Sequence, residues 1–317
     1  MTVLQLADRL RTEADAYLLL EDMRWNGRPV CPHCGSVGEH YFLNPANGKS
    51  RKTRTGAESE RRVWKCRDCR KQFSVLTGTI FHGTKIPIRT WLMVAFDAST
   101  AKNGISAREI ERKYGLTPRS AWHLMHRLRE AMKLEPIAGL LSGRVVADET
   151  WIGGDPKNRH ANRPNAIMGH GNTDKTTVLT LVSRETGEAR SRVIPDVRGV
   201  TLRAAMFDHL DLANTNLYTD GHKGYQNFTA KHSTVDHVIG EYVRGDVTTN
   251  HAEGYFSQLK RSIDGTHHHV SREHLHRYLA EFDFRYTTCK RTDAERMELL
   301  IGKVAGRRLT YRSPTRG

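Results

Sequence analysis

Alternating apolar and polar positions in the second half of the chain predict a series of β-strands. Residues 145–152, 176–182 and 189–197 are rich in β-branched residues, and Glu185-Thr186-Gly187 predicts a hairpin turn between the last two. The pattern after them alternates between the two types of element: a helix at 201–210, strands at 216–220 and 235–243, and a longer helix from about 251. Three antiparallel strands followed by alternating helices and strands predict an α/β domain.

The first half contains two helical patterns that are separated by a short turn. Ser106 and Glu109 have the spacing of a capping box, which opens a helix that ends near Gly115. Thr117-Pro118 starts a second helix, with apolar residues at helical spacing. This pattern predicts a helix-turn-helix, although a helical hairpin with no DNA contact has the same pattern. The face of the second helix expected to meet DNA carries Arg119, Ser120, His123 and Arg127.

Four of the five cysteines form two pairs with metal-site spacing. Cys31 and Cys34 make the first pair, and Cys66 and Cys69 make the second. Two such pairs suit one structural Zn²⁺ ion with tetrahedral thiolate ligands. The alternatives are a redox pair and four buried free thiols, whereas Cys289 has no partner and is expected to serve packing.

The net charge of +15 indicates a polyanionic partner. About two-thirds of the excess lies in residues 1–140, which suggests a nucleic-acid-binding front half; a solvated basic surface is the alternative. No stretch approaches the ~18 consecutive apolar residues of a membrane span, and the start of the chain lacks a signal-peptide pattern. We therefore expect a cytoplasmic protein with no membrane partner.

Three carboxylates in the second half are candidates for metal binding. Asp148 lies in the first predicted strand, Asp220 ends the fourth, and Glu253 lies on the following helix. Parallel pairing of the first and fourth strands would bring the aspartates together, and hard oxygen ligands of this kind suit two Mg²⁺ ions. Strand alternation places Glu149 on the opposite face, and Asn250, one turn before Glu253, is a reserve ligand.

Five histidines follow the last of these carboxylates and form a second possible cluster. They are expected to contact DNA, with metal binding as the alternative. They are His267, His268, His269, His274 and His276.

Several blocks of the chain resemble bacterial insertion-sequence transposases of the ISXO-like group. The segments at 31–35, 64–75 and 78–87 are similar to the amino-terminal zinc ribbon of that family. The segments at 147–154, 219–225 and 249–261 are similar to the three blocks of its DDE catalytic domain. The similarity continues through 268–271 and 281–286, after which Thr287 replaces the asparagine that usually follows Arg-Tyr.

The resemblance implies a DDE transposase with a ribonuclease H-like fold. It implies that Asp148, Asp220 and Glu253 hold two Mg²⁺ or Mn²⁺ ions, and that Lys260 is the basic residue that follows the glutamate in the family. The implied partners are double-stranded DNA, as terminal inverted repeats and as target. Joining two DNA ends implies a homodimer or higher oligomer, associated with the nucleoid of a bacterium. The implied reactions are phosphodiester hydrolysis and transesterification.

We expect four regions along the chain. They are an N-terminal helix plus zinc ribbon at 1–90, a helix-turn-helix region at 91–138, the catalytic domain at 139–290 and a basic C-terminal tail at 291–317. Two other functions fit the same residues: a catalytically silent, transposase-derived DNA-binding regulator, and a structure-selective nuclease that does not join strands.

Overall fold

The chain forms two compact units. The computed structural model describes residues 1–43, 51–52, 56, 58–133, 139–153, 175–226, 228, 231–235, 241 and 243–310. The first unit comprises Met1–Ala101, Ile105–Met132 and Arg291–Gly317, and the second comprises Lys102–Gly104 and Lys133–Lys290. No described helix is long and apolar enough to cross a membrane.

The first unit begins with two helices and a small sheet. Its elements are α1 (Val3–Arg9), α2 (Glu13–Trp25), the three-stranded sheet β1 (Tyr41–Phe42), β4 (Trp64–Lys65) and β5 (Gln72–Phe73), and the pair β2 (Arg51–Lys52) and β3 (Glu58–Ser59). Trp25 at the end of α2 packs edge-on against Trp64 and Phe73, with ring centroids 6.3 and 5.9 Å away. Glu21 accepts hydrogen bonds from Arg62 Nε and Trp64 Nε1, at 2.7 and 3.0 Å. These contacts hold α2 against the sheet.

The expected helix-turn-helix segment is present. It consists of α4 (Ala107–Tyr114) and α5 (Pro118–Met132), preceded by α3 (Ile88–Thr100). Ser106 Oγ accepts from the Glu109 amide at 3.1 Å, but the Glu109 carboxylate pairs with Lys113 at 2.9 Å instead of completing the capping box. Gly115 ends α4 with a left-handed φ of 63°.

The end of the chain belongs to the first unit, which corrects the predicted separate tail. Helix α9 (Asp293–Gly302) buries Met297, Leu300 and Ile301 there. The backbone after it bonds back to the segment near Gly78, since Ile80 N donates to Val304 O at 3.2 Å. These contacts cross more than 200 residues, so helical periodicity alone contained no sign of them.

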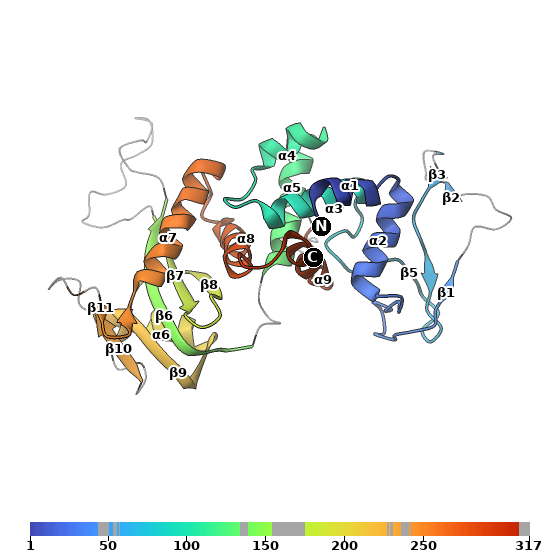
Figure 1. The fold of residues 1–317 in the computed structure, drawn as a ribbon. Coiled ribbons are helices and arrows are strands. Elements are labelled where there is room, and N and C mark those ends of the chain that lie inside the picture. The colour runs from blue at the N-terminus through green and yellow to red at the C-terminus, as the bar shows by residue number, and fades with distance from the viewer. Residues whose placement is uncertain are drawn as a thin grey trace, which may run out of the picture. The chain divides into compact units, whose positions relative to one another are not determined.

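The second unit is a mixed five-stranded sheet with helices on both faces (Figure 1). Its main elements are β6 (Leu141–Ile152), β7 (Thr176–Ser183), β8 (Ala189–Ile194), α6 (Gly199–Phe207), β9 (Leu210–Asp220), β10 (His232–Val235), α7 (Asn250–Ser262) and α8 (Leu275–Thr287). The strand order is β10-β9-β6-β7-β8. Strands β6, β7 and β8 are antiparallel neighbours, whereas β9 runs parallel to both β6 and β10. The predicted α/β architecture is confirmed.

Several strand boundaries differ from the sequence prediction, and β6 begins at Leu141, four residues early. Strand β8 ends at Ile194 because Pro195 has no amide hydrogen for the ladder. Strand β9 starts at Leu210, six residues early, and continues past an irregularity in its pairing with β6. The expected strand at 235–243 is replaced by β10 and a short hairpin of β11 (Val243–Arg244) and β12 (Val247–Thr248); residues 236–240 and 242 lie outside the described residues.

Two apolar cores cover opposite faces of this sheet. On one face, Val146, Val178 and Tyr218 pack with side chains of α7 and α8. On the other, Val145, Leu179 and Leu217 pack with residues of α6. Alternation along each strand therefore decides which side chains face α7.

Candidate functional site

The four paired cysteines converge in the first unit. Their sulfur atoms all lie within 4.8 Å of one another, with Cys31 Sγ 3.7 Å from Cys69 Sγ and Cys34 Sγ 3.6 Å from Cys66 Sγ. Tetrahedral Zn²⁺ with bonds of about 2.3 Å places neighbouring sulfurs about 3.8 Å apart. The arrangement fits one structural zinc ion.

Two similar turns position these cysteines. Gly35 N donates to Cys31 O at 2.9 Å in the first turn, and Cys66 N donates to Lys71 O at 2.9 Å in the second. Gly35 and Arg70, each directly after the second cysteine of its pair, have left-handed φ values of 76° and 61°. The same backbone turn thus occurs twice, and each turn presents two thiols on one side.

The two aspartates lie on adjacent parallel strands, as predicted. The register of β6 and β9 pairs Val146 with Tyr218, and Asp148 and Asp220 each lie two residues further along. Since Val146 and Tyr218 face α7, the alternation places both aspartates on that face. Glu253 projects from α7 as an exposed side chain.

Backbone amides orient one oxygen of each aspartate. Glu149 N donates to Asp148 Oδ1 at 2.8 Å, and His222 N donates to Asp220 Oδ1 at 3.1 Å. Neither Oδ2 atom accepts a hydrogen bond from any described residue. Thr249 Oγ1 lies 3.3 Å from Glu253 Oε1, one turn earlier on α7.

The electrostatics of Asp148 show that these carboxylates interact. Burial, together with the charges of Glu149, Asp220 and Glu253, raises the pKa of Asp148 to about 7, although the hydrogen bond from the Glu149 amide opposes the rise. Among the described residues, only the cysteine group converges within 4.8 Å, so the three carboxylates are spread more widely than one ion requires.

Glu149 lies on the opposite face, as strand alternation predicted. It accepts a short hydrogen bond from Tyr225 Oη, and its Oε1 lies 3.9 Å from His222 Nδ1. Burial raises the pKa of Glu149, whereas the bond from Tyr225 lowers it. Glu149 therefore fixes the loop after Asp220 to β6.

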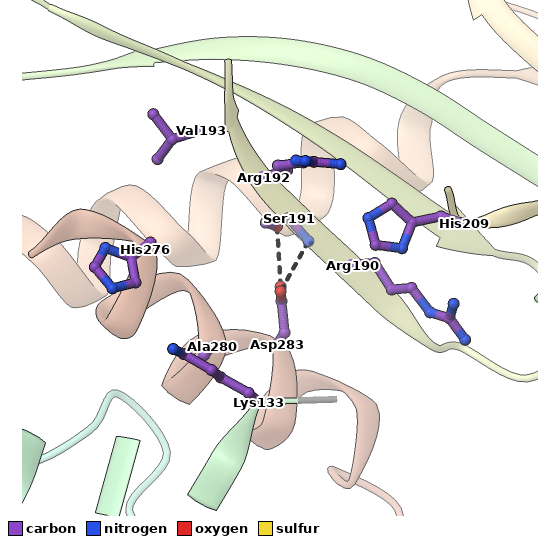
Figure 2. Close-up of a pocket in the computed structure, with 9 residues that line it drawn as sticks. All are labelled: Lys133, Arg190, Ser191, Arg192, Val193, His209, His276, Ala280 and Asp283. Carbon is purple, nitrogen blue, oxygen red and sulfur yellow. Dashed lines mark hydrogen bonds between the residues drawn. The ribbon is translucent and has the colours of Figure 1, made fainter. Parts of the chain in front are cut away.

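A buried polar network connects the sheet to α7, and no pattern in the sequence predicts it. Asp283 Oδ1 on α8 accepts from Tyr255 Oη at 2.5 Å and from Ser191 Oγ at 2.9 Å, and Oδ2 accepts from Ser191 N at 2.8 Å. Figure 2 shows Asp283 reaching the edge of β8 at Ser191. Burial raises the pKa of Asp283 to about 7, although these hydrogen bonds favour its ionised form.

The network extends to the strand opposite Asp148. Thr180 Oγ1 lies 2.9 Å from Ser191 Oγ, and Thr180 is the cross-strand partner of Asp148. Tyr255 is two residues from Glu253 on α7. The network therefore joins the element that carries Glu253 to the strands beside Asp148.

Helix α8 also bonds to the edge of β8 through Thr287, at the position where the family usually has asparagine. Thr287 Oγ1 accepts from Ala189 N at 3.1 Å, one turn of α8 beyond Asp283. A threonine hydroxyl thus supplies the acceptor that this edge amide needs, and α8 remains helical through Thr287.

The predicted DNA-facing residues of α5 are not equivalent. Arg119 is exposed, and Ser120 and His123 are half-buried. Arg127 is buried, donates to His82 O at 2.7 Å and lies over the Trp91 ring, so its predicted position on the exposed face is wrong. Along an α-helix, residues four positions apart differ in direction by about 40°, because four residues make slightly more than one full turn. Arg127 is consequently rotated about 80° from Arg119, toward the core.

The histidine segment after α7 does not form a compact ligand group. His267 packs edge-on against Tyr278 at 4.8 Å, whereas His268 and His269 are exposed. No set of three histidine or acidic groups in the described segments comes within 4.8 Å. Lys260 is exposed on α7, seven residues after Glu253.

Comparison with known proteins identifies two family domains in the chain. Residues 11–72 match the transposase zinc-ribbon domain, and residues 140–287 match the ISXO2-like transposase domain. A Halobacterium salinarum protein described as "Uncharacterized protein in transposable element ISH50" is 26% identical over 305 residues, covering 92% of this chain and 96% of that protein. The DDE domain implies a ribonuclease H-like fold, which the mixed sheet has. The chain belongs to the insertion-sequence transposases that combine a zinc ribbon with an ISXO2-like DDE domain.

Proposed function

We propose that this transposase binds the terminal repeats of its element, cleaves DNA there and joins the freed ends to target DNA. Asp148, Asp220 and Glu253 hold two Mg²⁺ or Mn²⁺ ions in this proposal. The observation that carries it is the parallel pairing of β6 and β9, which puts two aspartates on the face covered by α7.

The donor set supports divalent cations. Each aspartate has one oxygen held by a backbone amide, so its other oxygen is directed without loss of side-chain freedom on binding. The raised pKa of Asp148 reflects a cost of burying negative charge that a bound cation would remove. Two bound ions would activate the attacking water or 3′-hydroxyl and stabilise the leaving oxygen.

Other residues of the chain position the DNA. Lys260 lies two helical turns from Glu253, where its ammonium group would hold a phosphate near the carboxylates. In the first unit, Arg119, Ser120 and His123 of α5 and the basic ribbon would bind the repeat. Holding two DNA ends together would need at least two copies of the chain.

The experiment is a cleavage and joining assay with labelled DNA carrying the element's own ends. The protein with Mg²⁺ or Mn²⁺ is expected to nick at the repeat boundary and to join the 3′-end to target DNA. Asp148→Asn, which removes charge but keeps shape, is expected to abolish both products. Asp208→Asn, an exposed change at the end of α6 on the opposite face of the same unit, is the control for loss of one acidic charge.

Two results would overturn the proposal. Specific binding of the ends with no metal-dependent chemistry would identify a regulator. Cleavage of DNA junctions without any joined product would identify a nuclease.

A further inference from the structure

A second cavity lies beyond the carboxylates, at the end of β6. Its volume is about 270 Å³, and its walls come from the ends of β6 and β7, the last turn of α7 and the turn that follows α7. We call it the β6-end pocket, and it is lined chiefly by Ile152, Lys175, Lys260, Asp264, His268 and His269.

The side chains that line the pocket carry an excess of positive charge. Lys175 and Lys260 contribute two cationic groups and Asp264 one acidic group, and none of them forms an ion pair with another described residue. Ile152 and Ile263 form apolar parts of the wall. An excess of cationic groups at a concave, partly apolar surface favours binding of an anion.

The turn after α7 directs two histidines toward this pocket. His268 Nδ1 lies 2.9 Å from Asp264 O, at hydrogen-bond distance. The backbone of His268 has a φ of 57°, which is uncommon for residues other than glycine. His267 is turned away and packs on Tyr278. Such unusual backbone geometry is retained where the surrounding structure fixes it, and it is concentrated at ligand sites.

We propose that the β6-end pocket binds a backbone phosphate of the DNA strand whose reacting phosphate lies at the carboxylates. This inference rests on the proposed function and assigns a subsite to it. Lys175 and His269 form the outer contact, and Lys260 lies on the side nearer the metal ligands.

The distance along the elements gives the register of this phosphate. Four residues of strand separate Asp148 from Ile152, about 13 Å, and seven residues of helix separate Glu253 from Lys260, about 10 Å. Neighbouring phosphates of one DNA strand lie roughly 6–7 Å apart, because the strand winds around the axis while it rises about 3.4 Å per nucleotide. The bound phosphate is therefore about two nucleotides from the reacting one.

The test combines DNA in which one phosphate has lost its charge with a protein in which the pocket side chains are neutral. Methylphosphonate linkages are placed one at a time within six nucleotides on either side of the cleavage position, in DNA of the element's own end. The wild-type protein is expected to lose about tenfold in cleavage rate at one linkage about two nucleotides away. The Lys175→Gln/His269→Gln protein is expected to be slow on unmodified DNA and to lose little more at that linkage.

Matched variants separate local contact from general charge. Lys231→Gln removes an exposed lysine at the start of β10 and is expected to behave like wild type. Lys175→Arg, with His269 unchanged, keeps the cation of the outer contact and is expected to retain most of the cleavage rate. Equal sensitivity of the wild-type and doubly substituted proteins at every linkage would overturn the assignment.

A binding measurement keeps the inference independent of catalysis. With Asp148→Asn protein, the logarithm of the DNA association constant is measured against the logarithm of salt concentration. The Lys175→Gln/His269→Gln change is expected to flatten the slope by about 0.9, the value for one phosphate contact. An unchanged slope together with normal cleavage by wild type would refute the subsite but leave the proposed function intact. A flattened slope together with no cleavage by the wild-type protein would support the subsite but refute the proposed function.

Discussion

The buried hydroxyl of Tyr255 is expected to hold α7, and with it Glu253, against the sheet. Tyr255 is fully buried, and its hydroxyl donates to Asp283 at 2.5 Å and lies 2.6 Å from Ser191 Oγ. Tyr255→Phe keeps the ring and removes only this group. Asp283 would keep its two bonds from Ser191, so the loss is one hydrogen bond to a charged acceptor.

The expected cost is about 1.5–3 kcal/mol, because hydrogen bonds to charged groups contribute that much. Every 1.4 kcal/mol changes an equilibrium tenfold, so local opening of α7 should become about 10- to 100-fold more frequent. Native-state hydrogen exchange, read by mass spectrometry on peptides covering Asn250–Ser262, measures this opening directly. The Mn²⁺ concentration needed for half-maximal cleavage should also rise, since Glu253 lies on the same helix.

Thr215→Val is the matched control. Thr215 is also buried, and its hydroxyl donates to Leu141 O at 3.1 Å in the same unit but outside the network. Loss of this neutral bond should leave exchange of α7 and the Mn²⁺ requirement unchanged. The reasoning is refuted if Tyr255→Phe leaves α7 protection intact, or if both variants weaken it equally.

Four other substitutions test separate features of the molecule. Asp148→Asn should stabilise the zinc-loaded protein without Mg²⁺ by about 2–4 kcal/mol at pH 8. In wild type, the folded-state pKa of Asp148 of about 7 exceeds the ordinary value of an aspartate, so the free energy of unfolding falls as pH rises through 7. The asparagine variant lacks this ionisable group. Urea unfolding from pH 5 to 8 checks this, and an equal pH dependence in both proteins would contradict it. Cys66→Ser should lower bound zinc from one ion per chain and abolish DNA binding while α7 stays protected from exchange; retained zinc would count against the site. Arg119→Ala should weaken DNA binding with little change in stability, as binding and melting assays would measure. Arg127→Ala should lower the free energy of unfolding by about 1–3 kcal/mol, because it leaves His82 O without its buried donor. The opposite pattern would show that Arg127 lies on the DNA-binding face.

Features that depend on short spacing or on strand order were predictable from the sequence. The pairs at Cys31 and Cys66 follow from two-residue spacing, and the structure brings their sulfurs together. The meeting of Asp148 and Asp220 required only that the first and fourth strands be parallel neighbours. Alternation along β6 then separated Asp148 from Glu149 without any further information.

The features that were missed depend on contacts between distant segments. Asp283 is an acidic residue in a helical pattern, and only the docking of α8 on the edge of β8 makes it an acceptor for Ser191 and Tyr255. The sequence predicts a tail at 291–317 because the partners of α9 lie near the start of the chain. The error at Arg127 has a local cause instead, because residues at steps of four do not stay on one face of a helix that has 3.6 residues per turn.

The central claim is that Asp148, Asp220 and Glu253 form one two-metal site. Titration of the zinc-loaded protein with Mn²⁺ in the presence of its end DNA, followed by electron paramagnetic resonance, measures this directly. The account predicts two bound Mn²⁺ ions per chain with magnetic coupling between them, binding that strengthens as pH rises through about 7, and loss of the coupled pair in Asp148→Asn. Undiminished coupled binding in that variant, or no Mn²⁺ binding by the wild-type complex, would contradict it.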